Sequence, residues 1–164
     1  MKEKIIKNSK ELLPYIIILI VVLLVRTFIV TPIKVNGNSM YKTLDGTEFM
    51  ILNKLSKIER YDIVVVDTKS DELIKRVYGL PGEKISIENN SIYINDKKIE
   101  DVYAYGETSN YESITLGSDE YFILGDNRVV SLDSRTIGPV KKSQIKGTTN
   151  FILYPFNRVG KVEK

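Results

Sequence analysis

The residues best suited to chemistry in this sequence are one serine and one lysine, because histidine and cysteine are both absent from its 164 residues. Ser39 lies in the segment Val35-Asn-Gly-Asn-Ser39-Met40, where glycine and asparagine tolerate the positive φ angles of tight turns. A serine that projects from such a turn can act as a nucleophile while its own backbone N–H helps to hold an oxyanion. Its base would have to be an amine, since neither imidazole nor thiolate is available. An ordinary turn has the same composition.

Lys75 is the leading candidate for that base. It lies between Glu72 and Leu80 in a segment whose pattern is typical of a β-strand. On a strand, Lys75 would share a face with Leu73 and Val77, so burial among aliphatic side chains would lower its pKa. A fall from about 10.4 to roughly 8 takes about 3 kcal/mol, which a few buried aliphatic side chains can supply. A charged lysine on a solvent-exposed edge strand would give the same pattern.

The third candidate segment, 125–135, reads Gly-Asp-Asn-Arg-Val-Val-Ser-Leu-Asp-Ser-Arg and directly follows an apolar run. If this segment is extended, Asp133 and Arg135 share a face and can form an ion pair. Ser131 can hydrogen-bond to a neighbouring amine. A surface loop rich in Asp, Asn and Gly would look the same.

An apolar stretch from Leu12 to Val30 predicts one transmembrane helix. Its nineteen residues would span about 28 Å as a helix, close to the hydrocarbon thickness of a bilayer, with Pro14 in the first turn. A cleaved signal peptide is the alternative, but the run is longer than a signal-peptide core and lacks a small-residue cleavage site. Lysines precede the stretch at four positions: Lys2, Lys4, Lys7 and Lys10. The positive-inside rule therefore predicts that residues 1–11 are cytoplasmic and residues 31–164 extracytoplasmic.

The remainder of the chain shows short β-rich runs between turn signals and no long helical periodicity. The predicted strands are 49–52, 61–67, 73–80, 84–88, 91–95, 121–124 and 149–154. Asn89-Asn90 predicts a tight hairpin turn, whereas the polar segment 104–118 predicts a surface loop. The expected fold class is mainly β, with an antiparallel sheet or barrel-like domain and one N-terminal transmembrane helix.

The composition excludes several kinds of site. With 24 basic and 21 acidic residues, the net charge of +3 is too small and too mixed for a nucleic-acid surface. Without cysteine there is no disulfide framework, and without histidine the usual metal ligand is missing. No run of spaced carboxylates matches a calcium loop, so neither a metal nor another cofactor is expected.

Taken together and in order, these segments resemble a bacterial type I signal peptidase of the short, single-span form. Four segments carry the resemblance, and with the anchor they cover nearly the whole chain: 37–44, 75–83, 125–135 and 154–158. The third is the most specific of the four. The short interval between Lys75 and Gly125 indicates that the extra β domain of larger members is missing.

The resemblance implies a membrane-bound serine endopeptidase that removes signal peptides from exported preproteins without a cofactor. Ser39 would be the nucleophile and Lys75 the general base, which first takes the hydroxyl proton and then protonates the leaving amine. Ser131 would orient the Lys75 amine. Two ion pairs would brace the site, namely Asp126 with Arg76 and Asp133 with Arg135.

The resemblance also implies small pockets for the side chains at positions −1 and −3 of the signal peptide. The matching positions here are Ile33, Val35, Met40, Leu44 and Ile74. The substrate would bind in an extended conformation through backbone hydrogen bonds. The expected partners are preproteins and membrane lipid, with no nucleic acid, and we expect a monomer in the cell membrane.

The sequence departs from the family pattern at two positions. Lys42 stands where many members have proline, and Gly37 stands where some have a serine whose hydroxyl helps to form the oxyanion hole. The second oxyanion donor is then a backbone N–H or a water, and the sequence does not choose between them. Two other functions remain open. One is an inactive membrane-tethered β module that binds export partners; the other is a self-cleaving repressor, which would need a DNA-binding segment where this chain has an anchor.

Overall fold

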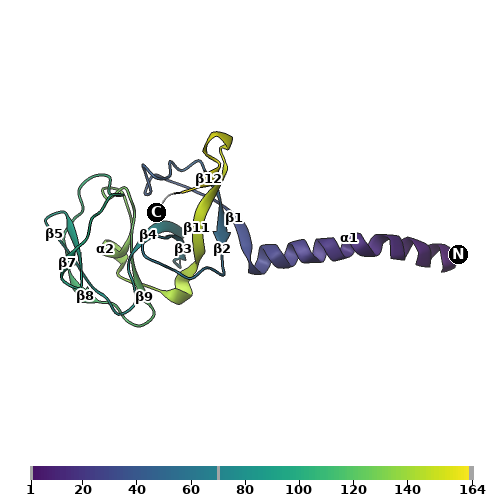
Figure 1. Ribbon diagram of the computed structural model, residues 1–164, viewed down its shortest axis with the longest axis horizontal. Helices are drawn as coiled ribbons and strands as arrows, with labels where there is room; N and C mark the ends of the chain where they lie inside the picture. Colours follow the sequence, from purple (N-terminus) through teal and green to yellow (C-terminus); the bar gives the residue numbers. More distant parts are fainter. Residues whose placement is uncertain (1, 70, 163–164) are drawn as a thin grey trace.

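A long helix and a β-rich domain make up the chain. The computed structural model describes residues 2–69 and 71–162; Met1, at the start of the predicted cytoplasmic segment, lies outside them. Helix α1 (Lys2–Phe28) extends away from the domain that holds the rest of the chain (Figure 1). Its stretch from Glu11 to Phe28 has a mean hydropathy of 2.3, and none of it is buried against the domain. Its length and composition are those of a membrane span.

The start of α1 differs from the prediction. The helix begins at Lys2, ten residues before the predicted span, so Pro14 lies inside the helix rather than in its first turn. Proline removes one backbone hydrogen bond there, and helices that cross membranes tolerate this loss.

Two hydrogen bonds define the other end of α1, which stops at Phe28, two residues before the predicted end. The Thr31 hydroxyl donates to the carbonyl of Arg26 (2.8 Å), and the Lys54 ammonium donates to the carbonyl of Thr27 (2.7 Å). Both acceptors are carbonyls of the last turn that have no partner within the helix. The chain therefore leaves α1 and enters the first strand with almost no linker.

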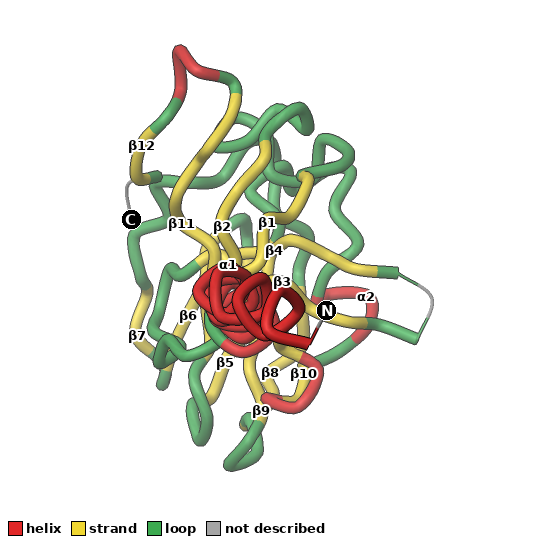
Figure 2. The backbone as a smooth tube through the Cα atoms, turned by 90° about the vertical axis from the view of Figure 1, so that its right-hand side faces the viewer, coloured by secondary structure: helices red, strands yellow, loops and turns green. Residues whose placement is uncertain are grey.

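The β domain contains two antiparallel sheets. The strands of the larger sheet are β1 (Val30–Lys34), β2 (Phe49–Asn53), β3 (Ile63–Asp67), β4 (Glu72–Gly79), β9 (Glu120–Leu124), β10 (Val140–Lys141), β11 (Ile145–Tyr154) and β12 (Gly160–Lys161). Their order is β1-β2-β11-β3-β4-β9-β10, with β12 paired to β11. This sheet curls around its core as a half-barrel, with the end of α1 next to β1 and β2 (Figure 2). The predicted fold class is confirmed.

The smaller sheet lies at the end of the domain farthest from α1 (Figure 1). Its strands are β5 (Lys84–Glu88), β6 (Ser91–Ile94), β7 (Lys97–Lys98) and β8 (Tyr111–Thr115), in the order β7-β6-β5-β8. Asn89 and Asn90, with φ angles of 47° and 61°, form the predicted tight turn between β5 and β6.

Short or half-exposed elements account for what the sequence pattern missed. β8 falls inside 104–118, so the prediction of a loop there was wrong. Only Tyr111 and Ile114 of β8 pack against the core, and its remaining residues are exposed and polar, which hides the strand in the sequence. β1 contains a proline, and β7, β10 and β12 have two residues each. One helical turn, α2 (Ser134–Ile137), and two 3-10 turns, η1 (Lys142–Gln144) and η2 (Phe156–Arg158), complete the fold.

Candidate active site

Ser39 lies in the loop that joins β1 to β2. Met40 and Leu44 anchor this loop because both side chains are buried in the core, and the Leu44 N–H donates to the Met40 carbonyl at 2.8 Å. Gly37 has a φ of 80°, a conformation that favours glycine. The serine is therefore partly exposed, while the loop that carries it is fixed by two side chains buried in the apolar core.

Asn127 connects this loop to the segment that follows β9. Its backbone N–H donates to the Ser39 carbonyl (3.0 Å), and its side-chain amide donates to the Asn38 carbonyl (3.1 Å). The close approach requires glycine at position 125, since a Cβ there would lie 2.6 Å from the Ser39 carbonyl oxygen and 2.1 Å from the Ser131 hydroxyl oxygen. Two of the segments that the sequence singled out therefore meet at the serine.

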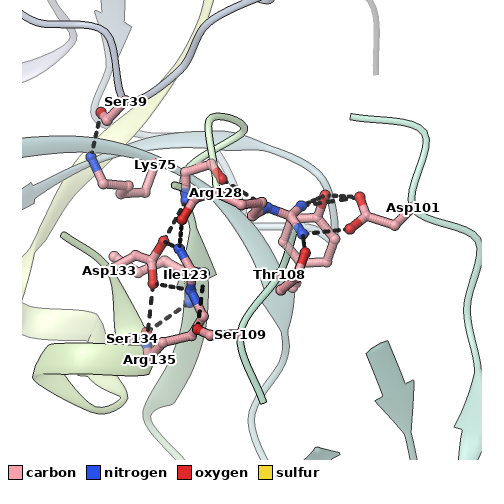
Figure 3. A network of polar contacts seen from close by, with 12 residues as sticks. Ser39, Lys75, Asp101, Thr108, Ser109, Ile123, Arg128, Asp133, Ser134 and Arg135 are labelled. Carbon is pink, nitrogen blue, oxygen red and sulfur yellow. Dashed lines mark hydrogen bonds and ion pairs between the residues drawn. The ribbon is translucent and has the colours of Figure 1, made fainter. Parts of the chain in front are cut away.

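Lys75 reaches the same point from the middle of β4. Its Nζ donates to Ser39 Oγ at 2.8 Å and to the Ile74 carbonyl at 2.8 Å, and the residue is 2% exposed (Figure 3). Lys75 takes part in none of the salt bridges recorded for residues 2–69 and 71–162. The amine is therefore held next to a hydroxyl and a carbonyl rather than a carboxylate.

Burial lowers the pKa of Lys75 to about 8, because the ammonium form loses its hydration. The charges of Asp133 and Asp126 oppose this shift without cancelling it. With this pKa, about one amine in ten is neutral at pH 7. A neutral amine is what a general base for a serine hydroxyl requires.

Arg76, the next residue along β4, forms a buried ion pair with Asp126. Two bonds join them, Nε to Oδ1 at 2.9 Å and Nη2 to Oδ2 at 2.7 Å, and the two side chains are 1% and 0% exposed. The Thr43 hydroxyl also donates to this carboxylate (2.5 Å), and the Tyr103 ring covers the guanidinium at 3.7 Å. This pair joins β4, the serine loop and the segment after β9.

A second ion pair joins Asp133 to Arg135, with both contacts at 2.9 Å (Figure 3). The buried Asp133 carboxylate also accepts the N–H of Gly125 at 3.0 Å and caps α2. Ser131 was expected to orient the Lys75 amine. Its hydroxyl is buried, and the described part of the chain offers it no hydrogen bond, to Lys75 or to any other group.

A hollow of about 120 Å³ opens beside the serine and the lysine. Its lining residues are Ile33, Lys34, Asn36, Ser39, Val65, Glu72, Leu73, Ile74 and Lys75. Among the predicted pocket residues, Ile33 and Ile74 line this hollow, whereas Val35, Met40 and Leu44 lie in the core behind them.

Sequence reasoning missed a clamp on the far side of the serine loop. The Glu48 carboxylate is fully buried and accepts the N–H groups of Asp45, Gly46 and Thr47 at 3.0 to 3.1 Å. The Arg158 guanidinium binds this carboxylate and donates to the Thr43 carbonyl at 2.8 Å. No local signal marks the pair, because its members are 110 residues apart.

A fourth charged cluster, which sequence reasoning also missed, surrounds Arg128. The Arg128 guanidinium binds Asp101 (2.6 Å), Thr108 (2.8 Å) and the Tyr78 hydroxyl (2.8 Å), and its Nε donates to the Gly125 carbonyl (2.9 Å) (Figure 3). Burial raises the pKa of the Tyr78 hydroxyl, which keeps it in its neutral form. For residues 2–69 and 71–162, no group of three acidic side chains lies close enough to hold a metal ion.

Comparisons of the sequence and of the structure with known proteins both find signal peptidases. The family model described as signal peptidase, peptidase S26, matches residues 9–154. The chain is 34% identical to signal peptidase I S of Bacillus subtilis over 98% of this chain and 99% of that one. It is 36% identical to a signal peptidase I of Bacillus amyloliquefaciens over 87% of this chain and 83% of that one. The crystal structure of a signal peptidase I from Enterococcus faecalis superposes with a TM-score of 0.51 at 29% identity, covering 57% of this chain and 97% of that one. The chain belongs to the signal peptidase family, peptidase S26.

Proposed function

We propose that this protein cleaves N-terminal signal peptides from exported preproteins, with Ser39 as nucleophile and Lys75 as general base. Membership of the signal peptidase family supports signal-peptide cleavage and a peptidase identity. The observation that carries the assignment of roles is the 2.8 Å hydrogen bond between the buried Lys75 amine and the Ser39 hydroxyl. The chain has no histidine or cysteine, and this amine is the base that is hydrogen-bonded to the hydroxyl.

The reaction follows from these two groups. Lys75 takes the hydroxyl proton as Ser39 Oγ attacks the scissile carbonyl, and the resulting ammonium then protonates the leaving amine of the mature protein. An acyl-enzyme remains, and a water that Lys75 deprotonates hydrolyses it. The Ser39 N–H serves as one donor to the oxyanion.

The surrounding residues position the two groups. The Arg76–Asp126 and Asp133–Arg135 pairs fix the strands and turns around the amine, and neither pair places a carboxylate in a salt bridge with Lys75. Ser131 is proposed to orient the amine, because its buried hydroxyl has no hydrogen-bond partner in the described chain and gains one by bonding to Lys75.

The hollow lined by Ile33 and Ile74 is proposed to receive the small side chains at positions −1 and −3 of the signal peptide. The side chains of Ile33 and Ile74 give it an apolar wall that suits methyl-sized groups. Val35, Met40 and Leu44 contribute by fixing the wall behind it. An extended substrate would add backbone hydrogen bonds at this edge.

The apolar helix and the family membership indicate a membrane-anchored protein. The four lysines before the span place its N-terminus in the cytoplasm and the β domain on the extracytoplasmic side. A monomer suffices for this function, because one chain supplies both reacting groups.

Cleavage of a defined preprotein by the purified full-length chain in detergent tests the proposal. Ser39→Ala and Lys75→Met should each reduce cleavage at least a thousandfold, since one removes the nucleophile and the other the base. Ser113→Ala and Lys98→Met, at exposed positions on the smaller sheet, are the matched controls and should cleave normally. Normal cleavage by Ser39→Ala would refute the role of Ser39, whereas no cleavage by the unaltered chain would leave the inactive β module as the better description.

A further inference from the structure

A second hollow lies next to the serine loop, with a volume of about 270 Å³. Its lining residues are Lys42, Thr43, Val102, Tyr103, Ala104 and Tyr105. It shares no residue with the hollow that contains Ser39 and Lys75. Nothing in the reaction described above uses it.

Hydrogen bonds link the wall of this second hollow to Ser39. The Asn127 N–H donates to the Ser39 carbonyl at 3.0 Å, and Asn127 pairs with Tyr105 in an isolated β-bridge. The Tyr105 N–H donates to the Asp126 carbonyl (2.7 Å), and the Arg128 N–H donates to the Tyr105 carbonyl (2.9 Å). The two hollows therefore border the same serine loop, one at Ser39 and the other at Lys42 and Thr43.

The second hollow carries an ammonium group at its wall. Lys42 is exposed, and its Nζ lies 5.1 Å from the centroid of the Tyr105 ring, which the Tyr41 ring also meets edge-on at 5.1 Å. Lys42 takes part in none of the salt bridges of the described chain, and the nearby Asp101 is bound by Arg128 at 2.6 Å. The positive charge of Lys42 is thus available to a ligand.

We propose that this hollow receives the first residues of the mature protein, on the leaving-group side of the scissile bond, and that Lys42 favours an acidic side chain there. The proposal rests on the proposed function. A peptide whose −1 residue occupies the first hollow must continue past Ser39, and five extended residues reach about 17 Å beyond the cut. Attraction between exposed charges of this kind changes kcat/KM by about two- to fivefold.

Site-directed cross-linking tests the location without requiring catalysis. Because the chain has no cysteine, Val102→Cys in the Ser39→Ala background introduces a single thiol at an exposed position in the hollow. Under mild oxidation it should form a disulfide with a preprotein that has one cysteine among the first five mature residues. It should not react with a preprotein whose cysteine lies in the apolar core of the signal peptide. Lys98→Cys, exposed on the smaller sheet, is the control and should capture neither.

Capture by Val102→Cys of signal-peptide cysteines only, or of none, would overturn the proposal, as would equal capture by Lys98→Cys. This readout separates the two proposals. Capture of the mature segment, together with no cleavage by the unaltered chain, would support the subsite and remove the proposed activity.

Charge exchange tests the preference. Preproteins that differ only by Glu, Gln or Lys within the first five mature residues should rank in that order of kcat/KM with the unaltered chain. Lys42→Glu should reverse the order, whereas Lys98→Glu should leave it unchanged. The preference should shrink in 0.5 M salt, because exposed charges are screened. Equal kcat/KM for the Glu and Lys preproteins, or an order that Lys42→Glu does not reverse, would refute the role of Lys42.

Discussion

Lys75 and Arg76 are neighbours on β4, yet the two faces of this strand hold their buried cations in opposite ways. Arg76 meets a carboxylate through two short bonds and lies under an aromatic ring. Lys75 meets only a hydroxyl and a carbonyl, although it is almost as buried, at 2% exposed against 1%. The two residues are about equally buried, but only the guanidinium has a carboxylate partner.

The difference means that Arg76 can serve only as a structural charge, whereas Lys75 can take part in proton transfer. A buried guanidinium cannot lose its proton, so its environment must neutralise it, and Asp126 does so. A buried lysine has a second option, which is to release its proton. The same strand can therefore supply a fixed ion pair on one face and a base on the other.

Removing the carboxylate on the Arg76 face should have the largest effect on stability. Asp126→Asn leaves a buried guanidinium without its counter-charge, which is expected to lower the free energy of unfolding by about 3–5 kcal/mol. Chemical denaturation in detergent, followed by circular dichroism, measures this change. Asp96→Asn is the control, because its ion pair with Lys84 is exposed and should contribute less than about 1 kcal/mol. Equal losses in the two variants would contradict the structural role of the Arg76 pair.

Removing the amine on the Lys75 face should increase the free energy of unfolding, whereas Asp126→Asn should decrease it. The pKa of Lys75 is about 8 in the folded chain and 10.5 when the side chain is fully hydrated, as in the unfolded chain, so below pH 8 folding carries a penalty of up to about 3 kcal/mol. Lys75→Met should therefore raise the free energy of unfolding at pH 7. Between pH 8 and 10.5 the unfolded chain binds more protons than the folded chain, so the unaltered protein gains stability and the gap should close. A gap that is independent of pH would show that Lys75 is not desolvated.

The pH dependence of cleavage tests whether the neutral form of Lys75 is the active form. With a pKa of about 8, the neutral fraction of Lys75 rises about tenfold between pH 7 and pH 9, so kcat/KM should rise by a similar factor. The charge of Asp133 raises this pKa, so Asp133→Asn should move the rise to lower pH in whatever activity it retains. A profile that is flat from pH 7 to 9 would remove Lys75 as the titrating base.

Local patterns were sufficient for much of the β framework. The Asn89-Asn90 turn and the apolar run at 63–66 were readable because tight turns and buried strands have strong signatures. β8 was missed because most of its residues are exposed and polar, so its sequence lacks the apolar alternation of a strand. The clamp of Glu48 and Arg158 was missed because each looks like a surface charge until the fold brings them together.

Some features of the site were also predictable from the sequence, and others were not. Because histidine and cysteine are absent, the sequence predicted Ser39 as nucleophile and Lys75 as base. The many polar groups at 125–135 predicted a third segment of the site. The expected ion pairs of Asp126 and Asp133 are present. The expected contact of Ser131 with the amine is not, since a difference of about one ångström in a turn decides such a bond and no sequence pattern encodes it.

The amino-acid sequence was enough to show which functional groups this protein has, where an apolar helix can form and where most of the longer strands lie, because these depend on residue type and on neighbours close in the chain. Only the tertiary structure decided that the hydroxyl of Ser39 and the amine of Lys75, 36 residues apart, lie 2.8 Å from each other. It also decided that the amine is desolvated while the adjacent guanidinium is paired. Both outcomes depend on water excluded by strands distant in sequence, and the free energy of a buried charge is set by that surrounding packing.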